Sequence, residues 1–197
     1  MADKVLALFD FDGTLTHRDS LWSFLRFVRP GKFYILLLPE LPNLLFALFG
    51  VIKRGEAKRR LIARFLKNMP VSVYEETCAR FVKEKLPGML RKEAMQRLNW
   101  HKVNGHEICL VSASLDGYLK PWSLAYFSNC LCTKLSAERG HLSGKFALPN
   151  CNGPEKARRI KALYNLEEFK EIHAYGNSGG DKEMLQLATH RYFRRFS

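Results

Sequence analysis

Two aspartates separated by one residue are the first feature of the chain that could do chemistry. Residues 10–14 read Asp-Phe-Asp-Gly-Thr and follow the short apolar run Val5–Phe9. Two carboxylates this close repel one another unless a cation shares them. Oxygen-rich sites suit Mg²⁺, which usually keeps waters and contacts substrate phosphate. Asp10 and Asp12 therefore indicate a magnesium and phosphate site, although ordinary turn residues would give the same pattern.

Other polar positions also follow predicted strands. Ser112 comes directly after the apolar run 108–111, and a hydroxyl at a strand end can hold a phosphate oxygen. Residues 176–181 read Gly-Asn-Ser-Gly-Gly-Asp between a predicted strand and a helix, and Lys156 lies early in the preceding helix. Taken singly, such a serine is usually a helix cap and such a lysine is usually solvated. In an α/β sheet, however, the carboxyl ends of the strands form the ligand-binding edge.

The elements that must position these residues form an alternating pattern with a long helical interruption. A strand is predicted at Val5–Phe9 and a helix at Ser20–Val28, capped by Asp19. Further helices are predicted at 56–68, 72–85 (capped by Ser72), 89–102, 116–127, 154–164 and 180–188. Further strands are predicted at 107–111, 131–138, 142–148, 171–175 and 190–196. The pattern indicates one α/β domain with a helical insertion.

Residues 33–52 form the most apolar stretch of the chain. Its length approaches the ~20 residues of a membrane-spanning helix, but the sequence Pro-Glu-Leu-Pro-Asn at 39–43 interrupts it. Two short helices that meet at a kink are therefore expected. Basic residues follow at once, namely Lys53, Arg54, Lys58, Arg59, Arg60 and Arg64. The stretch is either the core of the helical insertion or a contact with an anionic lipid surface.

Composition narrows the class of protein and its partners. The 197 residues are 47% hydrophobic and 26% charged, which excludes a disordered or collagen-like chain. The net charge of +13 indicates an anionic partner, either nucleic acid, an acidic membrane or a phosphorylated substrate. Nucleic acid is not expected, because we find no helix-turn-helix, aromatic RNA-binding pattern or zinc module. Five scattered cysteines without metal-binding spacing indicate reduced thiols inside a cell.

Together, the polar positions resemble the four motifs of the haloacid dehalogenase (HAD) superfamily. Residues 10–14 are similar to its first motif, Ser112 to its second, Lys156 to its third and residues 176–181 to its fourth. The helical block resembles the cap of the phosphoserine-phosphatase-like subfamily IB, which includes the phosphatidylglycerophosphatase C type. The resemblance implies a HAD-like Rossmannoid α/β core domain, a parallel sheet flanked by helices, at residues 1–16 and 104–197. It also implies a helical C1-type cap domain at residues 17–103.

The resemblance also implies a role for individual residues. Asp10 would be the nucleophile that forms an aspartyl-phosphate, and Asp12 would be the general acid and then the general base. Ser112 and Lys156 would take part in catalysis by binding the phosphoryl group and offsetting its charge. The implied substrate-binding residues are Asp19, Ser112, Ala113 and Lys156.

The implied cofactor is Mg²⁺, with Asp10, Asp12, Asn177 and Asp181 as metal-binding residues. The fourth motif of the family usually begins Gly-Asp, and this chain has Asn177 in place of that aspartate. An amide oxygen can bind Mg²⁺ but supplies no negative charge. We therefore expect weaker metal binding than a carboxylate would give.

The implied activity is Mg²⁺-dependent hydrolysis of a phosphate monoester. The substrate would be a small molecule or a lipid phosphate such as phosphatidylglycerophosphate. We expect the protein in the cytoplasm, with the anionic inner face of the cytoplasmic membrane as a candidate binding surface. The alternative is a weakly active or non-catalytic HAD-fold protein that binds anionic membrane or phosphorylated ligands. The net charge and Asn177 favour that alternative.

Overall fold

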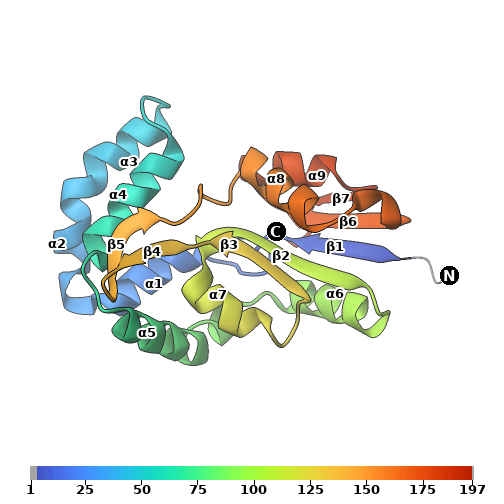
Figure 1. Ribbon diagram of the computed structural model, residues 1–197, viewed down its shortest axis with the longest axis horizontal. Coiled ribbons are helices and arrows are strands. Elements are labelled where there is room, and N and C mark those ends of the chain that lie inside the picture. The colour runs from blue at the N-terminus through green and yellow to red at the C-terminus, as the bar shows by residue number, and fades with distance from the viewer. Residues whose placement is uncertain (1–3, 197) are drawn as a thin grey trace.

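A five-stranded parallel sheet forms the centre of the computed structural model, which describes residues 4–196 (Figure 1). The strand order is β3-β2-β1-β6-β7, so β1 lies in the middle. The strands are β1 (Val5–Phe9), β2 (Glu107–Leu115), β3 (Asn129–Thr133), β6 (Glu171–Gly176) and β7 (His190–Phe193). Residues 1–3 of the predicted core domain lie outside the described residues. This order brings the carboxyl ends of β1, β2 and β6 together, as the sequence predicts.

Helices cover both faces of the sheet, which confirms the predicted α/β class. Figure 1 shows α8 (Pro154–Leu163) and α9 (Lys182–Gln186) on one side and α6 (Lys92–Val103) and α7 (Asp116–Ser123) on the other. Alternate residues of β1 face opposite ways. Leu6 and Leu8 belong to the core beneath α8 and α9, whereas Ala7 and Phe9 belong to the other core.

The helical region between β1 and β2 shares that second core. It contains α1 (Ser20–Val28), α2 (Phe33–Leu37), α3 (Leu41–Leu48), α4 (Arg54–Leu66) and α5 (Val71–Glu84), followed by α6. Phe24, Phe65 and Phe81 are buried in one cluster with Phe9. A 3-10 turn at Leu38–Glu40 separates α2 from α3, which confirms the predicted break in the apolar stretch.

A small antiparallel hairpin, β4 (Leu135–Glu138) and β5 (His141–Phe146), lies outside the main sheet and packs against α4. The backbone amide of Asn68 donates to the carbonyl of Leu142 at 2.9 Å. Gly144 has φ +79°, and a β-carbon there would lie 3.0 Å from that of Ala63. The close approach of hairpin and helix therefore depends on glycine. The domain boundaries at residues 16/17 and 103/104 stay a prediction.

Several predicted elements differ in extent. The strand predicted at 131–138 is two strands, because β3 ends in the parallel sheet and β4 begins the hairpin after Lys134. The predicted Ser72 cap is wrong, since α5 begins at Val71 after Pro70 and has no side-chain cap. The helix predicted at 89–102 begins only at Lys92, because Pro87–Met89 forms a 3-10 turn.

Differences near the carboxyl edge affect the site more directly. Strand β2 continues to Leu115, so Ser112 lies within the strand and not after it. Helix α7 ends at Ser123, four residues before the predicted end. Helix α9 begins at Lys182, because Gly179–Asp181 forms a separate 3-10 turn.

Candidate active site

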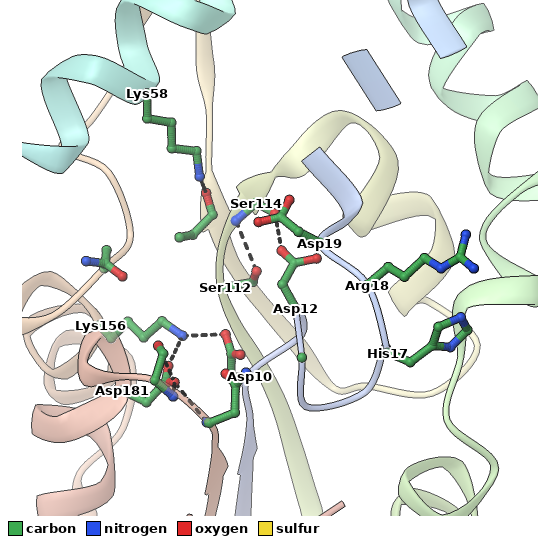
Figure 2. A pocket seen from close by; sticks show the side chains of 15 residues that line it. Asp10, Asp12, His17, Arg18, Asp19, Lys58, Ser112, Ser114, Lys156 and Asp181 are labelled. Atoms are coloured by element: carbon green, nitrogen blue, oxygen red, sulfur yellow. Dashed lines mark hydrogen bonds and ion pairs between the residues drawn. The ribbon is translucent and has the colours of Figure 1, made fainter. Parts of the chain in front are cut away.

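One pocket at the carboxyl edge of the sheet contains every site residue predicted from the sequence (Figure 2). These residues are Asp10, Asp12, Asp19, Ser112, Ala113, Lys156, Asn177 and Asp181. They come from the ends of β1, β2 and β6 and from the starts of α1 and α8. Four segments far apart in the sequence therefore meet in one place, as parallel strand ends allow.

A buried lysine between two buried aspartates forms the floor of the pocket. The Nζ atom of Lys156 donates to Oδ1 of Asp10 and to Oδ1 of Asp181, at 2.6 Å in both cases. Lys156 and Asp181 are each 1% exposed, and Asp10 is 6% exposed. Three charged groups this deeply buried are rare unless they are paired. Pro154, in the first turn of α8, helps to place Lys156 here, because its fixed φ suits a helix start.

The charge balance of this triad is uneven, because one ammonium group serves two carboxylates. Burial raises the pKa of Asp10 to about 7, although the charge of Lys156 acts in the opposite direction. Burial likewise opposes ionisation of Asp181, but Lys156 and Ser178 hold the pKa of Asp181 below its usual value. The carboxylates raise the pKa of Lys156 against the effect of its own burial. Asp10 is therefore the carboxylate that a further cation would stabilise most.

Asp181 is held by the turn that follows β6. Its Oδ2 atom accepts from the backbone amides of Asn177 and Ser178, at 3.1 and 2.9 Å, and from the Ser178 hydroxyl at 2.9 Å. The Ser178 side chain in turn caps the amide of Gly180, which completes a capping box. With Lys156 on Oδ1, both oxygens of Asp181 accept hydrogen bonds from the protein. This arrangement suits a residue that positions Lys156.

Asn177 lies against the loop that follows β1. Gly13 has φ +77°, and a β-carbon at this position would lie 2.0 Å from Nδ2 of Asn177. The absence of a side chain at residue 13 therefore lets the Asn177 amide reach the loop that carries Asp10 and Asp12. This contact explains why the first motif needs glycine here.

Asp12 accepts hydrogen bonds on both carboxylate oxygens. The amide of Ser20, at the start of α1, donates to its Oδ1 at 2.6 Å, and the Ser114 hydroxyl donates to its Oδ2. These two bonds connect the first motif to the helical region and to β2. They fix a carboxylate at the mouth of the pocket, close to the Asp10 triad (Figure 2).

Ser112 and Ala113 face the pocket from β2. The fully buried Ser112 hydroxyl accepts from the amide of Ser114 at 3.0 Å. The carbonyl of Ala113 accepts from Nζ of Lys58 at 2.6 Å. Lys58 extends from α4 into the pocket (Figure 2), so the helical region supplies a cation to the site. Burial lowers the pKa of Lys58, while Asp12 and Asp19 favour its charged form.

Sequence reasoning missed Lys58 as a site residue. Within the run of basic residues, Lys58 alone precedes Leu61, Ile62 and Phe65 at helical spacings of three, four and seven, and these three residues are buried. This periodicity places Lys58 on the inward face of α4. The other missed residues that line the pocket are Gly13, His17, Arg18, Ser114, Asn152 and Ser178.

Asp19 serves as a helix cap as well as a pocket residue. Its Oδ1 atom accepts from the amides of Leu21 and Trp22, at 2.9 and 3.3 Å, as predicted for the start of α1. Burial raises the pKa of Asp19, and the charge of Asp12 adds to that shift. A second, mostly apolar groove shares Asp19 and Lys58 with this pocket. It continues between α1, α3 and α4.

The residues of the pocket fit a hard divalent cation. Carboxylate, amide and backbone oxygens are the ligands that Mg²⁺ takes in proteins. Asp10, Asp12 and the side chain of Asn177 lie on the two adjacent loops described above. The unbalanced charge around Asp10 gives a cation an electrostatic reason to bind there.

The fold and the pocket agree with a match to a known hydrolase family. A model of haloacid dehalogenase-like hydrolases matches residues 7–186, and the chain belongs to this family. The fold is that of the phosphoserine phosphatases.

Particular proteins and solved structures are similar to this chain. The chain is 29% identical to Protein CicA of Caulobacter vibrioides over 98% of its own length and 87% of that protein. A structure of a protein of unknown function from Bordetella pertussis Tohama I superposes with a TM-score of 0.82. It is 20% identical and covers 95% of this chain and 88% of that one. A phospho-aspartyl intermediate analogue of phosphoserine phosphatase superposes with a TM-score of 0.69, at 18% identity. It covers 94% of this chain and 84% of that one.

Proposed function

We propose that the protein is a Mg²⁺-dependent phosphomonoester hydrolase that acts through an aspartyl-phosphate on Asp10. The observation that carries the proposal is the buried triad of Asp10, Lys156 and Asp181 beside Asp12 in one pocket. A related fold has been captured as a phospho-aspartyl intermediate analogue, which supports the same chemistry here.

In the first step, a carboxylate oxygen of Asp10 attacks phosphorus. The Lys156 ammonium group donates to Oδ1 of Asp10 at 2.6 Å, whereas the Thr14 hydroxyl donates to Oδ2 at 3.3 Å. The more weakly engaged Oδ2 is therefore the better nucleophile. A bond from Oδ2 to phosphorus forms while the ester P–O bond breaks. Asp12 gives a proton to the leaving alkoxide. The Ser112 hydroxyl can donate a hydrogen bond to a phosphoryl oxygen, and Lys156 offsets negative charge on the transferred group.

In the second step, Asp12 removes a proton from a water molecule that attacks the aspartyl-phosphate. The phosphorus–Oδ2 bond breaks, inorganic phosphate leaves, and both aspartates return to their initial states. Asp10, the backbone carbonyl of Asp12 and Asn177 would hold Mg²⁺, with Asp181 in the outer shell. When bound, the ion would offset charge on the phosphoryl oxygens.

The direct test is turnover of p-nitrophenyl phosphate with Mg²⁺. Asp10→Asn removes the nucleophile, so we expect activity to fall by about 10³-fold or more. Asp116→Asn is the matched control, because Asp116 begins α7 and does not line the pocket. A wild-type protein no faster than Asp10→Asn would overturn the proposal and favour the non-catalytic alternative.

We further propose that the substrate is a phosphate monoester with an apolar substituent, such as a lipid phosphate. The apolar groove adjoins the catalytic pocket at Asp19 and Lys58. Apolar side chains line much of its length, including Leu21, Leu44 and Leu48. A headgroup phosphate at Asp10 would therefore leave an attached chain beside this groove. Comparing turnover of phosphoserine with that of phosphatidylglycerophosphate tests this choice.

The outer face of α2 and α3 supports a membrane partner. The exposed apolar side chains of these two helices and of the residues that join and follow them, which we call the apolar face, are Tyr34, Ile35, Leu38, Leu41, Leu45, Phe46, Leu48, Phe49 and Val51. The helical stretch Pro30–Leu48 has the length and hydropathy to cross a membrane, yet only 17% of it is buried. One such helix is weak evidence for a span. An exposed apolar surface of this kind more generally marks a binding site.

Charge around the apolar face favours an anionic bilayer. Glu40 is the only acidic residue between positions 29 and 55, and it is buried and paired with Arg64 at 3.0 Å. Exposed basic residues flank the face at both ends, namely Arg29, Lys32, Lys53 and Arg54. Each basic residue near an anionic surface contributes ~1 kcal/mol. We therefore propose peripheral association with the inner face of the cytoplasmic membrane.

Co-sedimentation with vesicles tests the membrane proposal. We expect binding to vesicles that contain phosphatidylglycerol, weaker binding to phosphatidylcholine alone, and release at high salt. The double variant Phe46→Ser, Phe49→Ser should lose binding. Val103→Ser with Leu124→Ser, which alters two exposed apolar residues elsewhere, should keep it. Equal binding by both double variants, or none by the wild type, would contradict the proposal.

A further inference from the structure

Two cysteines lie in direct contact on β3, which is the edge strand at the opposite end of the sheet from β7. The Sγ atoms of Cys130 and Cys132 are 3.0 Å apart. Residues two apart on a strand point to the same face, so the contact follows from the strand itself. Their Cα atoms should lie ~6.6 Å apart at the usual rise per residue. Disulfides span Cα separations of roughly 4.4–6.8 Å, so this pair lies at the upper end of the range.

The two thiols differ in accessibility and in acidity. Cys130 is partly exposed, whereas Cys132 is buried. A hydrogen bond from Cys132 lowers the pKa of Cys130, and Ser123 and Lys120 on α7 act in the same direction. Burial raises the pKa of Cys132 well above its usual value. Cys130 is thus the more accessible and more nucleophilic sulfur, and Cys132 is the adjacent partner.

We propose that Cys130 and Cys132 form a site of reversible oxidation, at which a peroxide closes an intrastrand disulfide. The Cys130 thiolate attacks one peroxide oxygen and becomes a sulfenic acid, while the O–O bond breaks. The other oxygen leaves as hydroxide and takes up the proton that the Cys130 thiol had released, which gives the first water. The Cys132 thiol then attacks this sulfur, the S–O bond breaks, and a second water carries away the thiol proton. The two sulfurs together lose two electrons, which reduce one hydrogen peroxide to water. A dithiol reductant reverses the change by thiol–disulfide exchange.

The end of β3 links this pair to the catalytic pocket. The carbonyl of Cys132 accepts from Nη1 of Arg159 at 2.7 Å. Arg159 lies one turn after Lys156 on α8. A disulfide would draw the two β-carbons towards the ~3.8 Å typical of a cystine. Strand β3 must therefore adjust at Cys132, where the hydrogen bond to α8 begins. We expect oxidation to displace α8 and with it Lys156.

Peptide mass spectrometry after peroxide treatment tests the site without reference to activity. We expect the peptide that contains both cysteines to lose two hydrogen atoms and to regain them with dithiothreitol. Cys130→Ser should abolish the change, and its partial exposure makes it the gentler substitution. Cys78→Ser is the matched control, because Cys78 is buried in α5, and it should leave the change intact. Two alkylatable thiols after treatment, or a bridge from Cys132 to Cys151, would overturn the proposal.

Turnover measured on the same samples tests the link to α8, and this part rests on the proposed function. We expect the rate with p-nitrophenyl phosphate to fall on oxidation and to recover with dithiothreitol in the wild type and in Cys78→Ser. Cys130→Ser should resist the loss. A cystine with unchanged turnover would overturn the link to α8. A protein that is inactive in every redox state would instead count against the proposed function.

Discussion

The candidate active-site pocket and the apolar face depart in opposite ways from the usual burial of apolar residues and exposure of charged ones. At the pocket, Asp10, Lys156 and Asp181 are charged and buried, and each is paired within the protein. On α2 and just after α3, large apolar side chains such as Ile35 and Phe49 are 71% and 78% exposed. Folding alone favours neither arrangement, because burying charge and exposing apolar surface both cost free energy. The contrast therefore supports the proposals that the pocket binds a phosphorylated substrate and that the apolar face binds a membrane.

Among substitutions in the pocket, removal of Lys156 should have the largest effect on stability. Lys156→Met leaves Asp10 and Asp181 buried without their cation, and losing one partner of a buried ion pair costs about 3–5 kcal/mol. Urea unfolding at pH 7 measures the change. Lys161→Met, an exposed position on the same helix, should stay within about 0.5 kcal/mol of the wild type. Equal stability of the two variants would contradict the triad as described.

Asn177→Asp should strengthen metal binding in the pocket. A carboxylate adds the negative charge that an amide lacks, so we expect half-maximal activation at about tenfold lower Mg²⁺, equivalent to about 1.4 kcal/mol. Titration of activity with Mg²⁺ provides the measurement. Asn152→Asp, a second asparagine of the pocket, should change it less. An unchanged titration would show that Asn177 does not face the metal.

Acid should destabilise the fold through a buried histidine that lies away from both regions. Burial lowers the pKa of His101 to about 3, and the nearby Arg97, His173 and His106 add to the shift. In the unfolded chain the His101 imidazole protonates near pH 6.5. Above that pH the residue therefore causes no loss in the free energy of unfolding. That free energy falls towards pH 3 by at most about 1.4 kcal/mol per unit from this residue.

Urea midpoints between pH 7 and pH 5 measure this dependence. His101→Gln should flatten it, whereas His141→Gln, at an exposed position in the hairpin, should not. If His101→Gln keeps the full slope, the acid sensitivity belongs to other groups.

Substitutions on the apolar face should have the smallest effect on folding. Ile35→Ser removes an exposed side chain, so the free energy of unfolding should change by at most about 0.5 kcal/mol. Phe24→Ala, in the buried cluster beneath α1, should cost about 3–5 kcal/mol. Thermal or urea unfolding compares the two. A large loss for Ile35→Ser would mean that α2 and α3 are part of the folded core in solution.

The resemblance to the four HAD motifs, together with strand periodicity and turn residues, was sufficient to predict where Asp10, Ser112 and Asn177 lie. Asp10 and Asn177 follow β1 and β6 as expected, whereas Ser112 lies within β2. The parallel order then brings them together without further information. The approximate extent of most helices is likewise local, as the Asp19 cap of α1 shows.

Packing between segments that are distant in the sequence determines the features of the fold and the site that were not predicted. The division of residues 129–138 between two sheets depends on the contact of β4 and β5 with α4, and no local signal at Lys134 marks it. Lys58 reaches the site only because α4 lies across the carboxyl edge of the sheet. An apolar stretch fits a buried core and a lipid contact equally well, so the sequence left the exposure of α2 and α3 open.

The packing of the hairpin on α4 has a consequence for any opening of the pocket. Two paired crossings link the helical region and hairpin to the main sheet. Thr16 bridges Leu90 at one, and the amide of Ala147 donates to the carbonyl of Lys134 at 2.8 Å at the other. If α4 moved, the hairpin packed against it should move with it, and the chain would then have to bend at both crossings. The two crossings would together form one hinge. Making the backbone more rigid at either crossing should slow the entry and release of ligand.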